Sequence, residues 1–179
     1  MKDVKLNNVV VLDESYATTT FTRLRGRCPR HQRLRAQVSG GHWRRLTILA
    51  AITVDGVLCA STIDAATDAE VFRMFVSQVL VPSLRPGMVV VMDNLSSHKV
   101  AGVVNAIEKA NCRVVYLPPY SPDLSPIEPT WSKVKQRLRT IGARDVPTLE
   151  TAIGHALASI TPNDCSGCFN ACGYSLLPR

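Results

Sequence analysis

The amino-acid sequence predicts an α/β fold with a central mixed five-stranded sheet, in which three antiparallel strands precede the parallel ones and helices flank the sheet. Residues 8 to 63 contain three apolar, β-branched runs, and an Asp-Gly turn separates the last two. Residues 67 to 117 then alternate between helical and strand patterns, which is typical of parallel strands joined by right-handed crossovers.

The antiparallel half consists of three short strands. Residues 8 to 13 (NVVVLD) form the first strand and end in an acid, and residues 46 to 54 and 57 to 63 form the second and third. Asp55 and Gly56 between the last two indicate a hairpin. A long arginine-rich segment is expected to form a loop after the first strand.

The second half alternates helix and strand. A helix starts near Thr67-Asp68-Ala69-Glu70, and Pro82 together with Pro86-Gly87 is expected to stop it. An apolar strand over 88 to 93 again ends in an acid, and a helix over 99 to 110 and a strand over 112 to 117 follow.

The end of the chain begins with a stiff loop. Residues 118 to 126 hold four prolines, so they form neither helix nor central strand. Ser125, Pro126 and Glu128 then mark the start of a helix that runs to about Arg139. A further amphipathic helix is expected over 148 to 160. We therefore predict one domain over 1 to 160 and a tail without a clear period over 161 to 179.

Charge and hydropathy restrict the partners. The chain carries a net charge of +7, and the forty residues between Glu14 and Asp55 contain eight arginines and no acid. Guanidinium groups without carboxylate partners favour phosphate contact, although a solvated basic loop is the alternative. No apolar run is long enough to span a membrane and the N-terminus is too polar for a signal peptide, so a cytoplasmic protein is expected.

Three of the six cysteines are clustered near the C-terminus. Cys165, Cys168 and Cys172 could hold zinc, but a structural zinc site normally needs four ligands and no Cys or His at motif spacing supplies the fourth. A zinc site is therefore disfavoured, and reduced thiols are expected.

Two carboxylates are predicted to lie together at one edge of the sheet. Asp13 and Asp93 each end an apolar strand, and parallel neighbours would place them side by side. Close carboxylates repel unless a cation lies between them, and their oxygens suit Mg²⁺ or Mn²⁺. Glu128, delivered by the proline loop in the first turn of a helix, is the candidate for a third ligand of a two-ion site.

Each acid also has an ordinary explanation. Asp13 and Asp93 could simply cap turns after apolar strands. Glu128 could be the third residue of a capping box and reach back to the amide of Ser125. The coincidence of all three in a basic chain favours the metal site.

The sequence resembles the DDE endonuclease domain of bacterial insertion-sequence transposases of the mariner superfamily over roughly residues 8 to 140. The resemblance rests on three segments, which are VVLDES from Val10, VMDNLSSH from Val91, and LPPYSPDLSPIE from Leu117 with Trp131 and Lys135 after it. Between Asp93 and Glu128 lie 34 residues, the spacing of this superfamily.

The resemblance implies an RNase H-like fold and a DNA transposase catalytic domain that cleaves transposon ends and joins them to target DNA, usually at TA. It implies two Mg²⁺ ions, replaceable by Mn²⁺, held by Asp13, Asp93 and Glu128. Asn94 and His98 match the motif after the second acid and are assigned supporting or phosphate-positioning roles. A homodimer on DNA is expected, in a bacterial cytoplasm at the nucleoid.

Basic residues near these motifs are the candidates for DNA contact. In the helix after Glu128, Trp131, Val134 and Leu138 are expected to be buried, and Lys135 lies on nearly the same face as Glu128. The expected DNA-contact residues are Arg23, Arg25, Arg27, Arg30, Arg44, Arg45, Lys99, Lys133, Lys135 and Arg139.

The sequence departs from the family in three places. Only twelve residues precede Asp13, where relatives carry a helix-turn-helix module, so a separate or frameshift-fused subunit is expected to recognise transposon ends. Pro129 is unusual for the motif, and the loop around Cys28 lacks a tryptophan. An inactive remnant that only binds DNA and a structure-selective nuclease of the same fold are the alternative functions.

Overall fold

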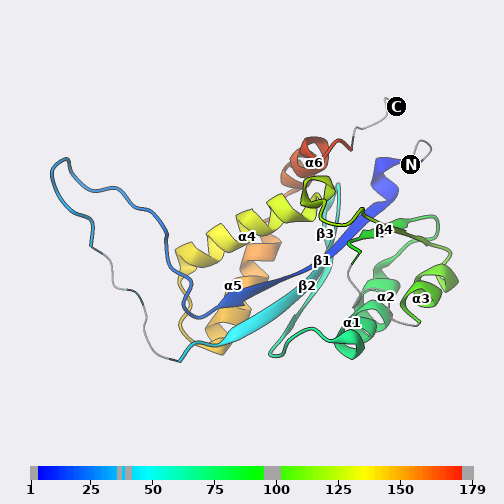
Figure 1. Ribbon diagram of the computed structural model, residues 1–179, viewed down its shortest axis with the longest axis horizontal. Helices are drawn as coiled ribbons and strands as arrows, with labels where there is room; N and C mark the ends of the chain where they lie inside the picture. Colours follow the sequence, from blue (N-terminus) through cyan, green and yellow to red (C-terminus); the bar gives the residue numbers. More distant parts are fainter. Residues whose placement is uncertain (1–3, 36–37, 39–41, 95–101, 175–179) are drawn as a thin grey trace.

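The computed structural model describes residues 4–35, 38, 42–94 and 102–174, and it is built on one five-stranded sheet of order β3-β2-β1-β4-β5 (Figure 1). β1 pairs antiparallel with β2, β2 pairs antiparallel with β3, and the β1/β4 and β4/β5 pairs are parallel. This arrangement confirms the predicted mixed sheet. The strands are β1 (Val9–Thr18), β2 (Arg45–Thr53), β3 (Gly56–Ile63), β4 (Val89–Met92) and β5 (Arg113–Tyr116).

Helices cover both faces of the sheet (Figure 1). One layer contains α1 (Ala69–Phe75), the π-helical turn η2 (Val76–Leu80), α2 (Val81–Ser83) and α3 (Val103–Lys109). The other contains α4 (Ile127–Ile141), α5 (Val146–Ala158) and α6 (Pro162–Ala171), while two 3₁₀ turns, η1 (Leu6–Asn8) and η4 (Pro122–Leu124), lie in connections.

Side-chain alternation along β1 separates two hydrophobic cores. Val9 and Val11 are buried in the core that α4, α5 and α6 cover. Val10 and Leu12 are buried in the core on the other face, with Phe72 of α1. Successive strand residues point to opposite faces, so Asp13 continues the face of Val9 and Val11, toward α4.

β1 is longer than expected, so the prediction that Asp13 ends its strand is wrong. The strand continues to Thr18 because residues 13 to 18 pair with β2 from Ala50 back to Arg45. The parallel pairing with the short strand β4 covers only Val9 to Val11. Asp13 therefore lies in the middle of β1, just beyond the part that β4 accompanies.

The helix after β3 ends between Pro82 and Pro86, where the sequence predicted that it would stop. Asp68 caps it, since its side chain accepts a hydrogen bond from the amide of Val71, as the sequence indicated. The helical path continues through η2 and past Pro82 to Ser83. Proline has no amide hydrogen, and at the first turn of α2, after a π-helical turn, that loss is tolerated.

The expected tail contains a helix that packs on the domain. α6 begins with a capping box in which Thr161 and Asp164 satisfy each other's backbone amides. Cys165 and Phe169 on this helix are fully buried in the core beside α4 and α5. A boundary after residue 160 would cut through this core. Within the described residues, no helix is long and apolar enough to cross a membrane.

Candidate active site

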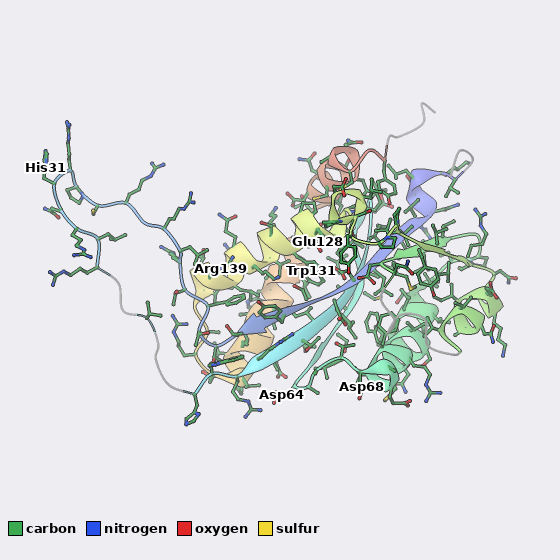
Figure 2. All side chains as sticks on the ribbon, in the orientation of Figure 1. His31, Asp64, Asp68, Glu128, Trp131 and Arg139 are labelled. Atoms are coloured by element: carbon green, nitrogen blue, oxygen red, sulfur yellow. The ribbon has the colours of Figure 1, made fainter. Side chains whose placement is uncertain are left out.

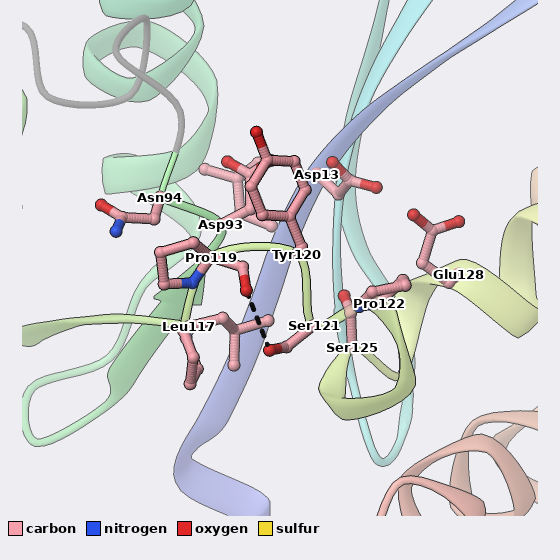
Figure 3. A pocket seen from close by; sticks show the side chains of 12 residues that line it. Asp13, Asp93, Asn94, Leu117, Pro119, Tyr120, Ser121, Pro122, Ser125 and Glu128 are labelled. Carbon is pink, nitrogen blue, oxygen red and sulfur yellow. Dashed lines mark hydrogen bonds between the residues drawn. The ribbon is translucent and has the colours of Figure 1, made fainter.

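The sheet register brings two of the predicted acids together. Val11 of β1 is paired with Val91 of β4, and Asp13 and Asp93 each follow two residues later. Both are partly buried and line one cavity with Asn94 and Glu128 (Figure 3). The remaining lining residues are Leu12, Leu117, Pro118, Pro119, Tyr120, Ser121, Pro122 and Ser125.

Glu128 reaches the cavity from the first turn of α4. The proline loop leads into η4 and then into the helix, and the amide of Glu128 donates to the carbonyl of Ser125. No side chain caps the start of α4, so the alternative in which Glu128 serves a capping box with Ser125 is wrong. The Glu128 side chain is exposed on the cavity side of the helix (Figure 3).

The carboxyl of Asp13 has a raised pKa. This pKa is raised to about 7, chiefly by burial and in smaller part by the neighbouring charges of Glu128 and Asp93. Hydrogen bonds from the Glu14 backbone and the Trp131 indole lower it in part. Mutual repulsion of three acids in one cavity is relieved when a cation lies between them.

The donor set fits a hard divalent ion. Asp13, Asp93 and Glu128 offer only carboxylate oxygens, which Mg²⁺ and Mn²⁺ prefer. Among the described residues, no three His, Cys, Asp or Glu side chains are already converged as a ligand cluster. The three carboxylates line the same cavity and would have to draw together to share an ion.

The second motif is only partly described. Asn94 follows Asp93 and lines the cavity. His98 and Lys99 lie outside the described residues.

The candidate DNA-contact residues fall into two groups. Arg23, Arg25, Arg27 and Arg30 are exposed on a segment that projects far from the domain, with His31 near its tip (Figure 2). This segment is tethered at its start, where the guanidinium of Arg144 donates to the carbonyls of Thr19 and Phe21 at 3.0 and 2.9 Å.

The second group lies along β1, β2 and α4. Arg45 and Lys135 approach the ring of Tyr16 at 4.4 and 5.0 Å, and Arg139 lies 5.0 Å from the ring of Phe21. These contacts hold three cations on the surface beyond the acids. We call Arg45, Lys135 and Arg139 the cationic strip.

Two of the expected DNA-contact residues have carboxylate partners. Arg44 pairs with Asp64, so the expectation that all eight arginines lack an acidic partner is wrong; the partner comes from just after β3, which adjoins β2. Lys133 pairs with Asp164 of α6 and holds the pKa of that carboxyl below its usual range.

The three C-terminal cysteines differ in burial: Cys165 is buried, and Cys168 and Cys172 are partly buried. Burial raises the pKa of Cys165 to about 11, which keeps its thiol protonated in the core. The hydroxyl of Thr130 lies 3.6 Å from the sulfur of Cys168. Cys165 and Cys168 therefore belong to the packing between α4 and α6.

Two aromatic contributions to the site were not anticipated. The Trp131 indole donates to Asp13, although the sequence indicated only that Trp131 is buried. Tyr120 lines the cavity with its ring fully exposed. Tyr120 stands between Pro119 and Ser121 in the sequence, and this context does not predict the direction of its ring.

Comparison with known proteins shows similarity in sequence family and in fold. The sequence profile of the DDE superfamily endonucleases matches residues 8–150. The Mos1 transposase paired-end complex with left transposon end has a similar fold, with a TM-score of 0.72 and 15% identity over 96% of this chain and 57% of that one. The isolated catalytic domain of Mos1 mariner transposase gives a TM-score of 0.66 and 14% identity over 94% and 79%. No curated protein sequence matches.

The sheet order and the helical layers define an RNase H-like fold. More particularly, the chain belongs to the DDE superfamily endonuclease family. It spans little more than half the length of the Mos1 chains solved in DNA complexes.

Proposed function

We propose that this chain is the catalytic domain of a DNA transposase, which cleaves phosphodiester bonds at transposon ends and joins the freed ends to target DNA. One observation carries the proposal: an acid in β1, an acid directly after β4 and an acid in α4 line a single cavity on the RNase H-like fold of a DDE endonuclease. Solved structures of Mos1 transposase include a paired-end complex with Mn and a strand transfer complex.

Asp13, Asp93 and Glu128 would hold two divalent ions, Mg²⁺ or Mn²⁺. When bound, such ions neutralise charge on the phosphodiester and activate the attacking hydroxyl group. Asp13 lies in β1, Asp93 directly follows β4, and Glu128 lies on α4, which packs on β1. Asn94, and His98 beyond it, would orient the phosphate or the ligands.

The cationic strip would bind phosphates of the DNA backbone beside the acids. Lys135 lies on α4 two turns after Glu128, and Arg45 extends the positive surface across β2. Because sequence-independent affinity for DNA comes mainly from phosphate contacts, these cations would position the duplex and not select its sequence. Arg23, Arg25, Arg27 and Arg30 would add contacts from the projecting segment.

Recognition of transposon ends would need a helix-turn-helix unit, either fused to this domain or supplied as a separate subunit. We further propose that the protein acts as a homodimer on paired ends, inserts at TA and works at the bacterial nucleoid.

Cleavage of DNA by the purified chain tests the proposal. Supercoiled plasmid and a duplex carrying the element's inverted repeat are incubated with Mg²⁺ or Mn²⁺, alone and with the upstream helix-turn-helix product. Nicking and strand-transfer joints are expected. Asp93→Asn and Glu128→Gln should abolish both while DNA binding persists, whereas Glu108→Gln on α3 is the matched control and should cleave normally.

The products separate the alternatives. Cleavage of branched or flapped DNA without strand-transfer joints would identify a structure-selective nuclease. Binding without any cleavage in either metal, in every combination, would identify an inactive remnant and overturn the proposal.

A further inference from the structure

Tyr120 has an unusual backbone and an unusual side chain. Its φ of 55° lies in the left-handed region, which residues with a β-carbon rarely adopt. Its ring is fully exposed, with a relative accessibility of 102%, the largest among the exposed apolar side chains. The ring therefore gains nothing from burial in the folded chain, and its position is unfavourable for the backbone.

The surrounding loop holds this conformation in place. The amide of Leu117 donates to the carbonyl of Met92 at the end of β4, which fixes the start of the loop. The hydroxyl of Ser121 donates to the carbonyl of Pro119 at 3.3 Å and so closes a turn around Tyr120. At the far end, the hydroxyl of Tyr174 donates to the carbonyl of Leu124 at 3.0 Å.

The ring of Tyr120 lies at the cavity that the three acids line. Tyr120 lines the same cavity as Asp13, Asp93 and Glu128, and Figure 3 shows its ring rising from the loop with the hydroxyl pointing away from the backbone. Backbone strain that persists beside a reactive site, with an aromatic ring left uncovered, points to a ligand that covers the ring.

The contrast with Tyr16 narrows the chemistry of that ligand. The ring of Tyr16 already has Arg45 and Lys135 against it. Among the described residues, no other ring and no cation contacts the ring of Tyr120, so both faces of this ring are available. In a cavity that accepts a phosphodiester, the flat apolar group next to the phosphate is a nucleobase.

We propose that Tyr120 is a stacking platform for a nucleobase adjacent to the phosphodiester that the three acids address. This inference rests on the proposed function and deepens it. A base inside a continuous duplex has both faces covered by its neighbours, so the base that stacks on Tyr120 is unpaired or turned out of the helix. The site consequently prefers DNA whose strand is frayed or single-stranded beside the cleaved bond.

Fluorescence of 2-aminopurine tests the stacking without requiring catalysis. The probe is a duplex with a 3′ single-stranded extension, carrying 2-aminopurine at successive positions across the junction, titrated with the full chain in the absence of metal. Quenching is expected at one or two adjacent positions. Tyr120→Phe should retain it, since the aromatic face is kept, and Tyr120→Asn should remove it, since asparagine accepts the left-handed backbone but lacks a ring.

Cleavage of the same DNA in Mg²⁺ or Mn²⁺ supplies the second readout. Loss of one stacked base should lower kcat/KM of Tyr120→Asn roughly tenfold or more, with Tyr120→Phe near wild type. Met74→Ala, which truncates an exposed side chain on α1, is the control and should behave as wild type. Circular dichroism verifies folding of each variant.

The outcomes for stacking and for function are separable. A wild-type chain that quenches the probe but cuts no DNA would contradict the proposed function and leave the stacking intact. Equal quenching by wild type and Tyr120→Asn, or no position-specific quenching by wild type, would overturn the stacking platform whether or not the chain cleaves.

Discussion

The indole Nε1 of Trp131 donates a hydrogen bond of 3.0 Å to Oδ2 of Asp13, and so joins α4 to the middle of β1. Trp131 is almost completely buried and lies one helical turn after Glu128. One helix therefore presents Glu128 to the cavity and also fixes the orientation of Asp13. The geometry of the two acids depends on how α4 packs on the sheet.

Replacing Trp131 with phenylalanine should slow cleavage while the fold persists. A hydrogen bond to a charged group contributes about 1.5–3 kcal/mol, so kcat should fall roughly tenfold or more, with little change in KM for DNA. Steady-state kinetics and thermal unfolding measure the two effects. Trp43→Phe makes the same change at an exposed tryptophan and should be neutral; unchanged kcat in Trp131→Phe would refute the positioning role.

The raised pKa of Asp13 should make the metal-free protein less stable as the pH increases. The pKa is about 7 in the folded chain against 3.8 for an ordinary aspartate, so the folded state binds more protons between these values. The contribution of Asp13 to the free energy of unfolding is therefore fully present below about pH 4. It declines between about pH 4 and pH 7, by on the order of a few kcal/mol in total.

Thermal unfolding across this pH range, without metal, checks the effect of Asp13. Asp13→Asn removes the titrating group, so this variant should lose less stability than wild type between pH 4 and 7. Mg²⁺ should stabilise wild type above pH 7 and leave Asp13→Asn nearly unchanged. Parallel pH curves for the two proteins would show that Asp13 does not carry the effect.

The cationic strip should contribute to DNA affinity through phosphate contacts. Lys135→Gln and Arg45→Gln should each weaken binding to any duplex and reduce the slope of log K against log salt by about 0.7–0.9. Arg113→Gln is a matched control because Arg113 starts β5, at the opposite end of the parallel strands from the acids. Fluorescence anisotropy over a salt series measures the slopes, and equal slopes for all variants would exclude the strip.

Replacing Tyr120 with glycine should not destabilise the protein. Glycine adopts a φ of 55° without the penalty of a β-carbon, which offsets the entropy that it adds to the unfolded chain, so the change should lie within about 1 kcal/mol of neutral. Urea unfolding gives the value. A loss of several kcal/mol would mean that the exposed ring supports the fold.

Phe169 should be essential to the stability of the whole domain. Its side chain is fully buried between α6 and the sheet-covering helices, so Phe169→Ala should cost about 3–5 kcal/mol. Its exposed neighbour Asn170 offers the control Asn170→Ala, which should change little. Independent melting of α6 in the Phe169→Ala variant, with the remainder unaffected, would argue for a dispensable tail.

Local pattern was sufficient to predict most elements. The apolar runs, the Asp55-Gly56 turn and the helical spacing gave the five strands and their mixed pairing, because these signals act over a few residues. The capping signature of Thr161 and Asp164 was equally local and was missed only because α6 has a weak apolar pattern. The end of β1 was misplaced because its last residues are held by β2, a partner distant in the sequence.

The sequence by itself singled out Asp13, Asp93 and Glu128 as the candidate acids, from the apolar runs before the two aspartates, the proline loop before the glutamate and, through the family resemblance, a spacing of 34 residues. Only the tertiary structure decided how they are held. Sheet register aligns Asp13 with Asp93, the packing of α4 gives Asp13 its indole donor, and burial raises its pKa. Such effects depend on distances between residues far apart in the chain, which no local pattern encodes.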